Sequence, residues 1–144
     1  MRNYTITRNN VTPNVANDLI TLVAATGKPI FIRRIRCSGE ATVSTAMRTV
    51  IQRCTAGTTP GGALTPEKTN TSDAAATTVV DTTWAAQPTL SGNPLYNESW
   101  NAFGGGFDIT LDGREIYLVS TEQLSIRNTV GTGLMSLDVE FVEL

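Results

Sequence analysis

Apolar residues recur at every second position along residues 107–144, and this alternation constrains the fold more than any other feature of the chain. Successive side chains of a β-strand point to opposite faces, so the pattern predicts strands that bury one face. Four runs show the pattern: 107–111, 116–118, 124–126 and 135–142. Asp112-Gly113 favours a type I′ turn between the first two runs. We therefore predict four strands joined as an antiparallel meander.

The last run predicts for each of its residues whether the side chain is buried or exposed. Its apolar residues occupy alternate positions and are expected in the core: Met135, Leu137, Val139 and Phe141. The polar residues between them are expected at the surface: Ser136, Asp138 and Glu140. A slip of one residue would exchange the two sets, so the burial of these side chains tests the register.

Further strands are predicted upstream, at residues 18–25, 28–37, 47–54, 77–85 and 98–103. The apolar pattern changes face beside Arg33-Arg34, and a β-bulge there would restore it. Residues 55–73 are rich in Thr, Gly and Pro and predict a long surface excursion. These elements predict an all-β fold, a jelly-roll-like antiparallel β-sandwich of about eight strands with an extended N-terminal arm.

The N-terminal segment leaves two alternatives open. Residues 1–16 contain a short β-prone run, Tyr4 to Thr7, followed by turn-forming residues. The run is either an edge strand of the protein's own sheet or an arm that reaches a neighbouring subunit. The domain organisation expected from the second alternative is an arm at 1–16 and a single β-sandwich domain at 17–144.

Composition excludes several kinds of catalytic and metal site. The chain has 144 residues and no histidine, which removes Ser-His-Asp and Cys-His catalysis. Two cysteines cannot supply the four ligands of a usual structural zinc site. Asp108, Asp112 and Glu115 lack the full ligand spacing of a calcium loop. We expect no catalytic residue, no cofactor and no metal, and hence no enzyme.

The two cysteines are expected to be free thiols. If residues 30–37 and 47–54 formed a simple antiparallel pair, Cys37 and Cys54 would lie roughly 24 Å apart along the ladder, at about 3.4 Å per residue. A disulfide requires Cα atoms within about 7 Å. Free thiols suit a reducing cytosol, and the polar N-terminus lacks the apolar region of a secretory signal. No apolar run approaches the roughly 18 residues of a membrane span.

Charge is unevenly distributed along the chain. Residues 1–53 carry eight Lys or Arg and two Asp or Glu, a net charge of +6, whereas residues 54–144 carry three and eleven, a net charge of −8. Neighbouring strands that pair opposite charges within one monomer would explain this distribution. Complementary surfaces between copies in an assembly are the alternative. Nucleic-acid binding has little support without an aromatic-basic motif.

Trp84 and Trp100 also leave alternatives open. Large aromatic residues usually pack in the core, but they also serve as interface anchors or as platforms for sugars. Sugar platforms commonly stand beside carboxylates, and Asp81 and Glu98 are near the tryptophans in sequence. A carbohydrate-binding β-sandwich, such as a module of a fibre or host-recognition protein, is therefore an alternative function.

Taken whole, the sequence resembles small capsid decoration (cement) proteins and related head proteins of tailed bacteriophages. The resemblance lies in the polar start MRNYTITRNNVTP, the Thr/Ala/Gly-rich middle, the segment NPLYNESWNAFGGG and the closing GTGLMSLDVEFVEL. Proteins of this class commonly have jelly-roll or related β folds and clamp neighbouring capsid subunits from the outside of the shell, often as trimers and sometimes as dimers.

The resemblance implies a structural virion protein on the capsid exterior, made in the bacterial host cytoplasm. Its expected partners are the major capsid protein and further copies of itself, with a trimer preferred over a dimer, and neither membrane nor nucleic acid is an expected partner. The candidate capsid or intersubunit contacts are Tyr4, Ile6, Arg8, Val11 and Trp84.

Overall fold

A computed structural model describes residues 1–15, 17–55 and 57–144 of the chain. These residues form thirteen strands and no helix. The strands are β1 (Arg2–Val11), β2 (Asp18–Val23), β3 (Ile30–Gly39), β4 (Ala46–Thr55), β5 (Thr58–Ala63), β6 (Glu67–Lys68), β7 (Val79–Ala86), β8 (Thr89–Leu90), β9 (Tyr96–Asn101), β10 (Gly106–Thr110), β11 (Ile116–Leu118), β12 (Gln123–Val130) and β13 (Met135–Glu143).

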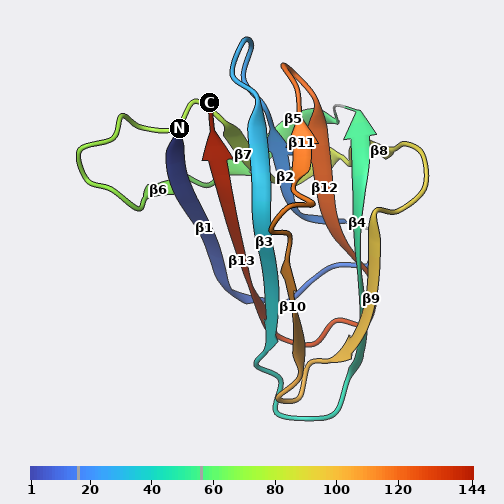
Figure 1. Ribbon diagram of the computed structural model, residues 1–144. Helices are drawn as coiled ribbons and strands as arrows, with labels where there is room; N and C mark the ends of the chain where they lie inside the picture. The colour runs from blue at the N-terminus through green and yellow to red at the C-terminus, as the bar shows by residue number, and fades with distance from the viewer. Residues whose placement is uncertain (16, 56) are drawn as a thin grey trace.

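The strands form two sheets, which we call sheet A and sheet B. Sheet A has the order β10-β3-β13-β1-β6, and β11 also pairs with β3. Sheet B has the order β5-β7-β2-β12-β4-β8, and β9 also pairs with β4. All strand pairs are antiparallel, and the sheets are arranged like the layers of a sandwich (Figure 1). The predicted all-β antiparallel sandwich is confirmed. The strands beyond the expected eight or so include β5 and the two-residue strands β6 and β8.

The four C-terminal strands do not form the predicted meander. β10 and β11 pair with β3, β12 pairs with β2 and β4, and β13 pairs with β3 and β1. The chain therefore crosses between the sheets after β11 and again after β12. Gly113 has the positive φ expected of a turn, +76°, but this turn joins two strands that follow one another along β3. Local alternation specified the strands correctly, whereas their partners depend on residues far away in the sequence.

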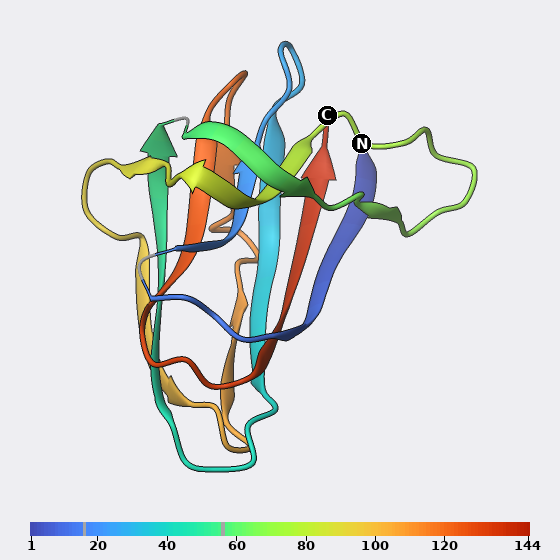
Figure 2. The ribbon, with the colours of Figure 1, turned by 180° about the vertical axis from the view of Figure 1, so that it is seen from behind.

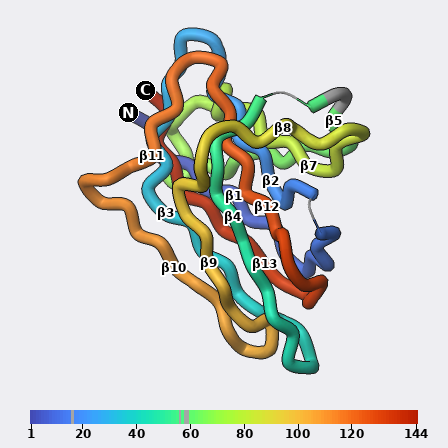
Figure 3. The backbone as a smooth tube through the Cα atoms, turned by 90° about the vertical axis from the view of Figure 1, so that its right-hand side faces the viewer, coloured from blue at the N-terminus to red at the C-terminus, as the bar shows by residue number. Residues whose placement is uncertain are grey.

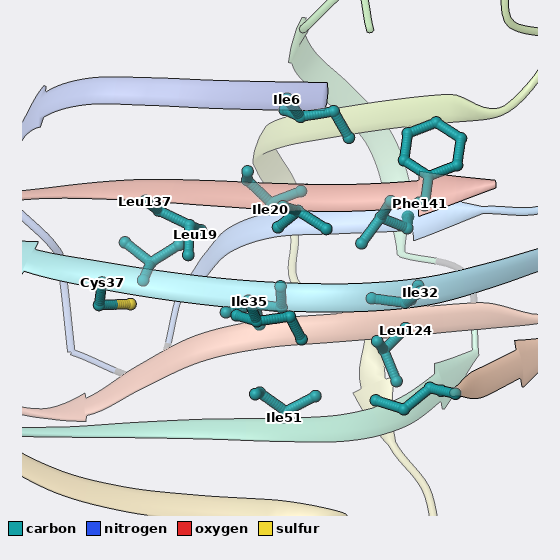
Figure 4. Packing of buried hydrophobic residues seen from close by; sticks show 14 of the residues in the cluster. Ile6, Leu19, Ile20, Ile32, Ile35, Cys37, Ile51, Leu124, Leu137 and Phe141 are labelled. Atoms are coloured by element: carbon teal, nitrogen blue, oxygen red, sulfur yellow. The ribbon is translucent and has the colours of Figure 1, made fainter. Parts of the chain in front are cut away.

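The core lies between the sheets (Figure 4). The apolar residues predicted to be buried in the last strand are all in it: Met135, Leu137, Val139 and Phe141. Ser136 was expected at the surface but is buried. Its hydroxyl accepts a hydrogen bond from Asn10 N and donates one to Glu40 Oε1. Asp138 is half-buried and Glu140 is exposed.

The predicted bulge in β3 is confirmed. Glu140 pairs with Arg34 and the next residue, Phe141, pairs with Ile32, which leaves Arg33 as the extra residue. A bulge shifts the alternation by one position. As a result, the apolar residues on both sides of it point into the core: Ile30, Ile32, Ile35 and Cys37.

Residues 2–11 are a strand of the protein's own sheet, not a separate arm. β1 pairs with β13 from Arg2 to Val11. Tyr4 and Ile6 are each only 1% exposed, and the Tyr4 ring stacks on Phe141 with centroids 5.4 Å apart. The boundary expected near residue 16 is therefore wrong, because alternate side chains of β1 complete the core of the sandwich.

The segment 55–73 was predicted as a long surface excursion. It contains β5, which pairs with β7, and the short β6, which pairs with Tyr4 and Thr5 of β1. Figure 1 shows the chain around β6 extending away from the sandwich before it returns to β7. Much of the segment is exposed, as predicted, but its ends are paired into the sheets.

Cys37 and Cys54 are free and buried, as predicted, but the reason differs. The predicted hairpin between β3 and β4 does not exist, because β3 belongs to sheet A and β4 to sheet B. Cys37 points into the core (Figure 4). Cys54 pairs with Gln123. It is three positions after the core residue Ile51, and side chains an odd number of positions apart on a strand point to opposite faces, so Cys54 lies on the outer face of sheet B.

Opposite charges pair within the monomer. Four ion pairs join a cation of residues 1–53 to an acid of residues 54–144: Arg34–Asp108, Arg34–Glu140, Arg36–Asp138 and Arg53–Glu122. A fifth joins Arg127 to Asp18. The uneven distribution along the sequence thus becomes local pairing between strands.

Candidate functional site

The five candidate contact residues divide into two groups in the structure. Tyr4 and Ile6 are in the core, where a partner of the folded protein cannot reach them. Arg8, Val11 and Trp84 line one hollow with a volume of about 240 Å³. The hollow lies between the end of β1, the connection to β2, and β7. Tertiary structure therefore brings together three of the five predicted residues, from segments more than 70 positions apart.

A second β-bulge shapes the floor of the hollow. Ile126 of β12 pairs with Ile20 and Arg127 pairs with Asp18, so Leu19 is the extra residue. Because of this bulge, Asp18 shares the outer face of sheet B with Thr21 and Ser125. Leu19 and Asp18 both line the hollow.

Asp18 is the centre of a buried polar cluster behind the hollow. Its carboxylate accepts hydrogen bonds from Thr21 Oγ1 at 2.5 Å, Ser125 Oγ at 2.6 Å and Arg127 Nε at 2.6 Å. Its backbone N–H donates to Gln87 Oε1 at 2.8 Å. A buried carboxylate is stable only when it is paired and hydrogen-bonded in this way. The cluster is thus a structural support, with its acid fully engaged.

Residues 84–92 cover this cluster on the outer face of sheet B. Arg127 Nη2 donates to Pro88 O at 2.8 Å and Gln52 Nε2 donates to Gly92 O at 2.6 Å. Figure 2 shows the segment crossing the strands of sheet B. The covering segment explains why polar residues of an outer sheet face are buried.

Arg8 is the free cation of the hollow. It is half-buried, and its Nη1 donates to Leu19 O. Among the described residues no carboxylate lies within ion-pair distance of it. Burial lowers the pKa of the Arg8 guanidinium, because desolvation disfavours the charged form.

Trp84 forms part of the wall. Its ring is half-buried, and its indole N–H donates to Thr21 Oγ1 at 2.9 Å. The preceding residue, Thr83, also lines the hollow and has a φ of +56°. A β-branched residue with positive φ is strained, and such strain concentrates at functional sites.

Trp100 belongs to the core instead. Its N–H donates to Thr49 Oγ1 at 3.0 Å, and its ring meets Phe107 edge to face at 6.2 Å. This contact joins β9 to β10 at the edge of the sandwich, where the two strands lie side by side (Figure 3). The carboxylates considered as sugar partners, Asp81 and Glu98, do not line the hollow. Asp81 is buried, and desolvation raises its pKa.

A second surface feature was missed in the sequence. We call it the distal tip: the loops 40–45 and 101–105 at the lower end in Figure 1. Val43 and Phe103 are 68% and 61% exposed there. The alternation pattern predicts Phe103 at the end of a strand, but it lies in the turn after β9. A large apolar residue next to Gly104-Gly105-Gly106 was the signal that could have identified this turn.

Hydrogen bonds hold the two loops of the distal tip together. Ala41 N donates to Ala102 O at 3.0 Å, and Ala102 N donates to Thr45 O at 2.9 Å. The Asn101 side chain accepts from Thr45 N and Phe103 N and donates to Ser44 Oγ. Phe103 is therefore presented to solvent on an ordered, cross-linked turn.

The thiols are poorly suited to nucleophilic chemistry. Burial raises the pKa of Cys54 to about 12, and it also raises the pKa of Cys37. Both groups therefore stay protonated at neutral pH. They are weak nucleophiles in this state, because only the thiolate is strongly nucleophilic.

Within residues 1–15, 17–55 and 57–144, no group of three or more Cys, Asp or Glu side chains is arranged to hold a metal ion. The same residues contain no helix that is long and apolar enough to cross a membrane. Comparisons of the chain with protein-family models, with curated proteins and with solved structures find no match.

Proposed function

We propose that this chain is a structural virion protein that binds the outer surface of a phage capsid and stabilises the shell by clamping neighbouring capsid subunits. The observation that carries the proposal is the distal tip, where Phe103 and Val43 are exposed on hydrogen-bonded loops. Aromatic residues on ordered surfaces are typical anchors of protein interfaces.

The strand order supports the proposal. Eight of the thirteen strands run in the order β10-β3-β13-β1 in one sheet and β9-β4-β12-β2 in the other. Eight strands in two such sheets, with the chain crossing between them, fit a double-sheet jelly roll, an architecture frequent in capsid proteins. The resemblance of the sequence to capsid decoration proteins points in the same direction.

In this function the protein acts without substrate, catalytic residue or cofactor. Its partners are the major capsid protein and further copies of itself, in a trimer or, less favoured, a dimer. It is made in the bacterial cytoplasm and resides on the capsid exterior. The buried, protonated thiols and the fully engaged Asp18 support a structural role.

Replacing the aromatic anchor tests the proposal. Phe103→Ala should weaken binding to undecorated shells at least about tenfold, since interface anchors contribute about 2 kcal/mol or more. Its unfolding midpoint should stay near that of the parent protein, because the ring is exposed. Cosedimentation with shells measures the binding. Val119→Ala, an exposed residue at the other end of the sandwich, is the matched control.

Equal cosedimentation of Phe103→Ala and the parent protein would show that Phe103 of the distal tip does not contribute to capsid binding. Absence of binding by the parent protein to any undecorated shell tested would refute the capsid proposal itself.

The hollow favours a second candidate function, carbohydrate binding. Trp84 offers part of an aromatic ring beside the side chains of Asn14, Asn17 and Gln87. An aromatic surface with neighbouring amides suits a hydroxylated ring. Loss of glycan binding in Trp84→Ala, with retention in Phe103→Ala, would assign this function to the hollow.

A further inference from the structure

The hollow that contains Arg8 and Trp84 carries an unbalanced positive charge. Asp18 is the acid in its lining, and Arg127 already neutralises it at 2.6 Å. Thr21 and Ser125 occupy further acceptor sites of the same carboxylate. Arg8 is therefore left as a cation without a counter-ion in the described part of the chain.

Arg8 has hydrogen-bonding capacity to spare. A guanidinium has five N–H donors, and the described contacts of Arg8 use one nitrogen, which donates to Leu19 O. This bond ties the side chain to β2 and leaves the remaining donors without a partner among the described residues. A carboxylate in the hollow would accept charge-assisted hydrogen bonds from them and compensate the partial desolvation of the cation.

The rest of the lining suits a small ring with hydroxyl groups. Trp84 contributes an apolar ring, and the side chains of Asn14 and Asn17 make no hydrogen bond within the described residues. Each carboxamide offers two donors and an acceptor. The volume of about 240 Å³ is below the roughly 300–1,000 Å³ of pockets for drug-sized ligands. A single sugar unit matches this size better than a longer ligand.

The wall of the hollow is held in a strained conformation. Thr83 has a φ of +56°, and a Cβ atom at Gly61 of the neighbouring β5 would lie 2.4 Å from Thr83 O. The close approach therefore requires glycine at position 61. Strain of this kind persists where the surrounding structure enforces it, and binding sites are a common place for it.

We propose that the hollow binds a monosaccharide unit that carries a carboxylate, such as a uronic acid. Arg8 pairs with the carboxylate, Trp84 packs against the ring, and Asn14 and Asn17 hydrogen-bond to its hydroxyls. This proposal rests on the candidate carbohydrate-binding function and extends it by naming the ligand class. It is independent of the capsid contact at the distal tip.

Calorimetric titration of the full chain tests the proposal with three probes: D-glucuronic acid, D-glucose and sodium acetate. We expect glucuronate to bind at least about tenfold more tightly than glucose, because only glucuronate pairs with the cation. We also expect it to bind more tightly than acetate, which offers the charge but no ring.

Variants locate the binding site. Arg8→Gln should reduce glucuronate affinity at least about tenfold and abolish the preference over glucose. Arg48→Gln, which changes an exposed arginine of β4, is the matched control and should leave affinity unchanged. Arg8 also ties β1 to β2, so a thermal melt must accompany its variant. Asn14→Ala alters an exposed side chain and should lower affinity roughly threefold to tenfold without loss of stability.

The outcomes distinguish failure of this proposal from failure of the carbohydrate-binding function on which it rests. Equal binding of glucose and glucuronate would overturn the acid preference and leave carbohydrate binding supported. Equal binding of acetate and glucuronate would overturn the sugar assignment. No binding of either sugar would overturn both, and glucuronate binding unchanged in Arg8→Gln and Asn14→Ala would overturn the location.

Discussion

At the scale of single residues, Glu143 shows how a buried carboxylate can join the two sheets. Its carboxylate is buried near the C-terminus of β13. One oxygen, Oε2, accepts hydrogen bonds at 2.9 Å from Thr77 N, Thr78 N and Thr78 Oγ1. The contact fastens the last strand of sheet A to the segment that leads into β7 of sheet B. A buried acid thus joins the two layers.

The contact predicts a pH-dependent stability. Burial acts to raise the pKa of Glu143, but the hydrogen bonds from Thr78 and Thr77 outweigh it, so the pKa lies below its ordinary value of 4.5. A lowered pKa in the folded state stabilises the protein above the unfolded pKa, and this contribution is lost as the pH falls through the folded pKa. Glu143→Gln should therefore be less stable than the parent at pH 7, by about 1–3 kcal/mol.

Urea unfolding at several pH values measures this difference. The gap between Glu143→Gln and the parent should narrow as the pH falls below about 4.3. Glu67→Gln, at an exposed position of β6, serves as the control. A gap that is constant from pH 7 to pH 3 would show that the ionised carboxylate contributes nothing.

At the scale of elements, β1 illustrates how a short polar segment can still be essential. Only alternate residues of it are apolar, and overall it looks too poor in apolar residues to pack. In the structure, however, Tyr4 and Ile6 both point into the core, and β13 supplies a full partner strand. Hydrogen bonds of the ladder and burial of two side chains together offset the entropy of ordering the segment.

Truncation is therefore expected to disrupt the fold rather than release a dispensable arm. Deletion of residues 2–11 should abolish cooperative unfolding, because it removes two core side chains and exposes the edge of β13. Ile6→Ala alone should lower the free energy of unfolding by about 2–5 kcal/mol. Thr7→Ala, at the adjacent exposed position, should change it by less than about 0.5 kcal/mol.

Urea denaturation followed by far-ultraviolet circular dichroism measures both variants. Near-native stability of the truncated chain would show that β1 is only loosely associated with the sandwich and would restore the interpretation as an arm.

At the scale of the whole molecule, the chain crosses repeatedly between the sheets, so neither sheet is a continuous piece of sequence. Sheet A combines β1, β3, β6, β10, β11 and β13, and sheet B combines β2, β4, β5, β7, β8, β9 and β12. Both sheets bury their inner faces against each other in one core. Neither layer has a partner for its apolar face when the other is absent, and we infer that the two form and break together.

This arrangement predicts a single cooperative unfolding transition. Trp84 and Trp100 both lie in sheet B, so tryptophan fluorescence reports mainly on that sheet, whereas far-ultraviolet circular dichroism reports on both. The two urea curves should coincide, as they do for two-state domains. A fluorescence transition clearly separated from the circular dichroism transition would show that the sheets unfold independently.

The sequence alone determined most of the strand segments, though not β5, β6 or β8, and it identified the buried face of most of the strands that it predicted. This information is local, because the alternation of apolar residues and the bulge beside Arg33 follow from side chains a few positions apart. It correctly identified the inner face of β13 and the shift in β3. It failed at Ser136, which is hydrogen-bonded to Asn10 of β1 and to Glu40 of the loop after β3.

Tertiary structure alone decided which strands pair and which residues meet. The expected meander and the assumed β3–β4 hairpin are both absent, because β3 pairs with β10, β11 and β13 whereas β4 pairs with β8, β9 and β12. The hollow of Arg8 and Trp84 and the distal tip depend on the same long-range packing. Alternation specifies the face that a strand must bury, but the partner is selected by the shape and chemistry of surfaces that exist only when the two sheets come together.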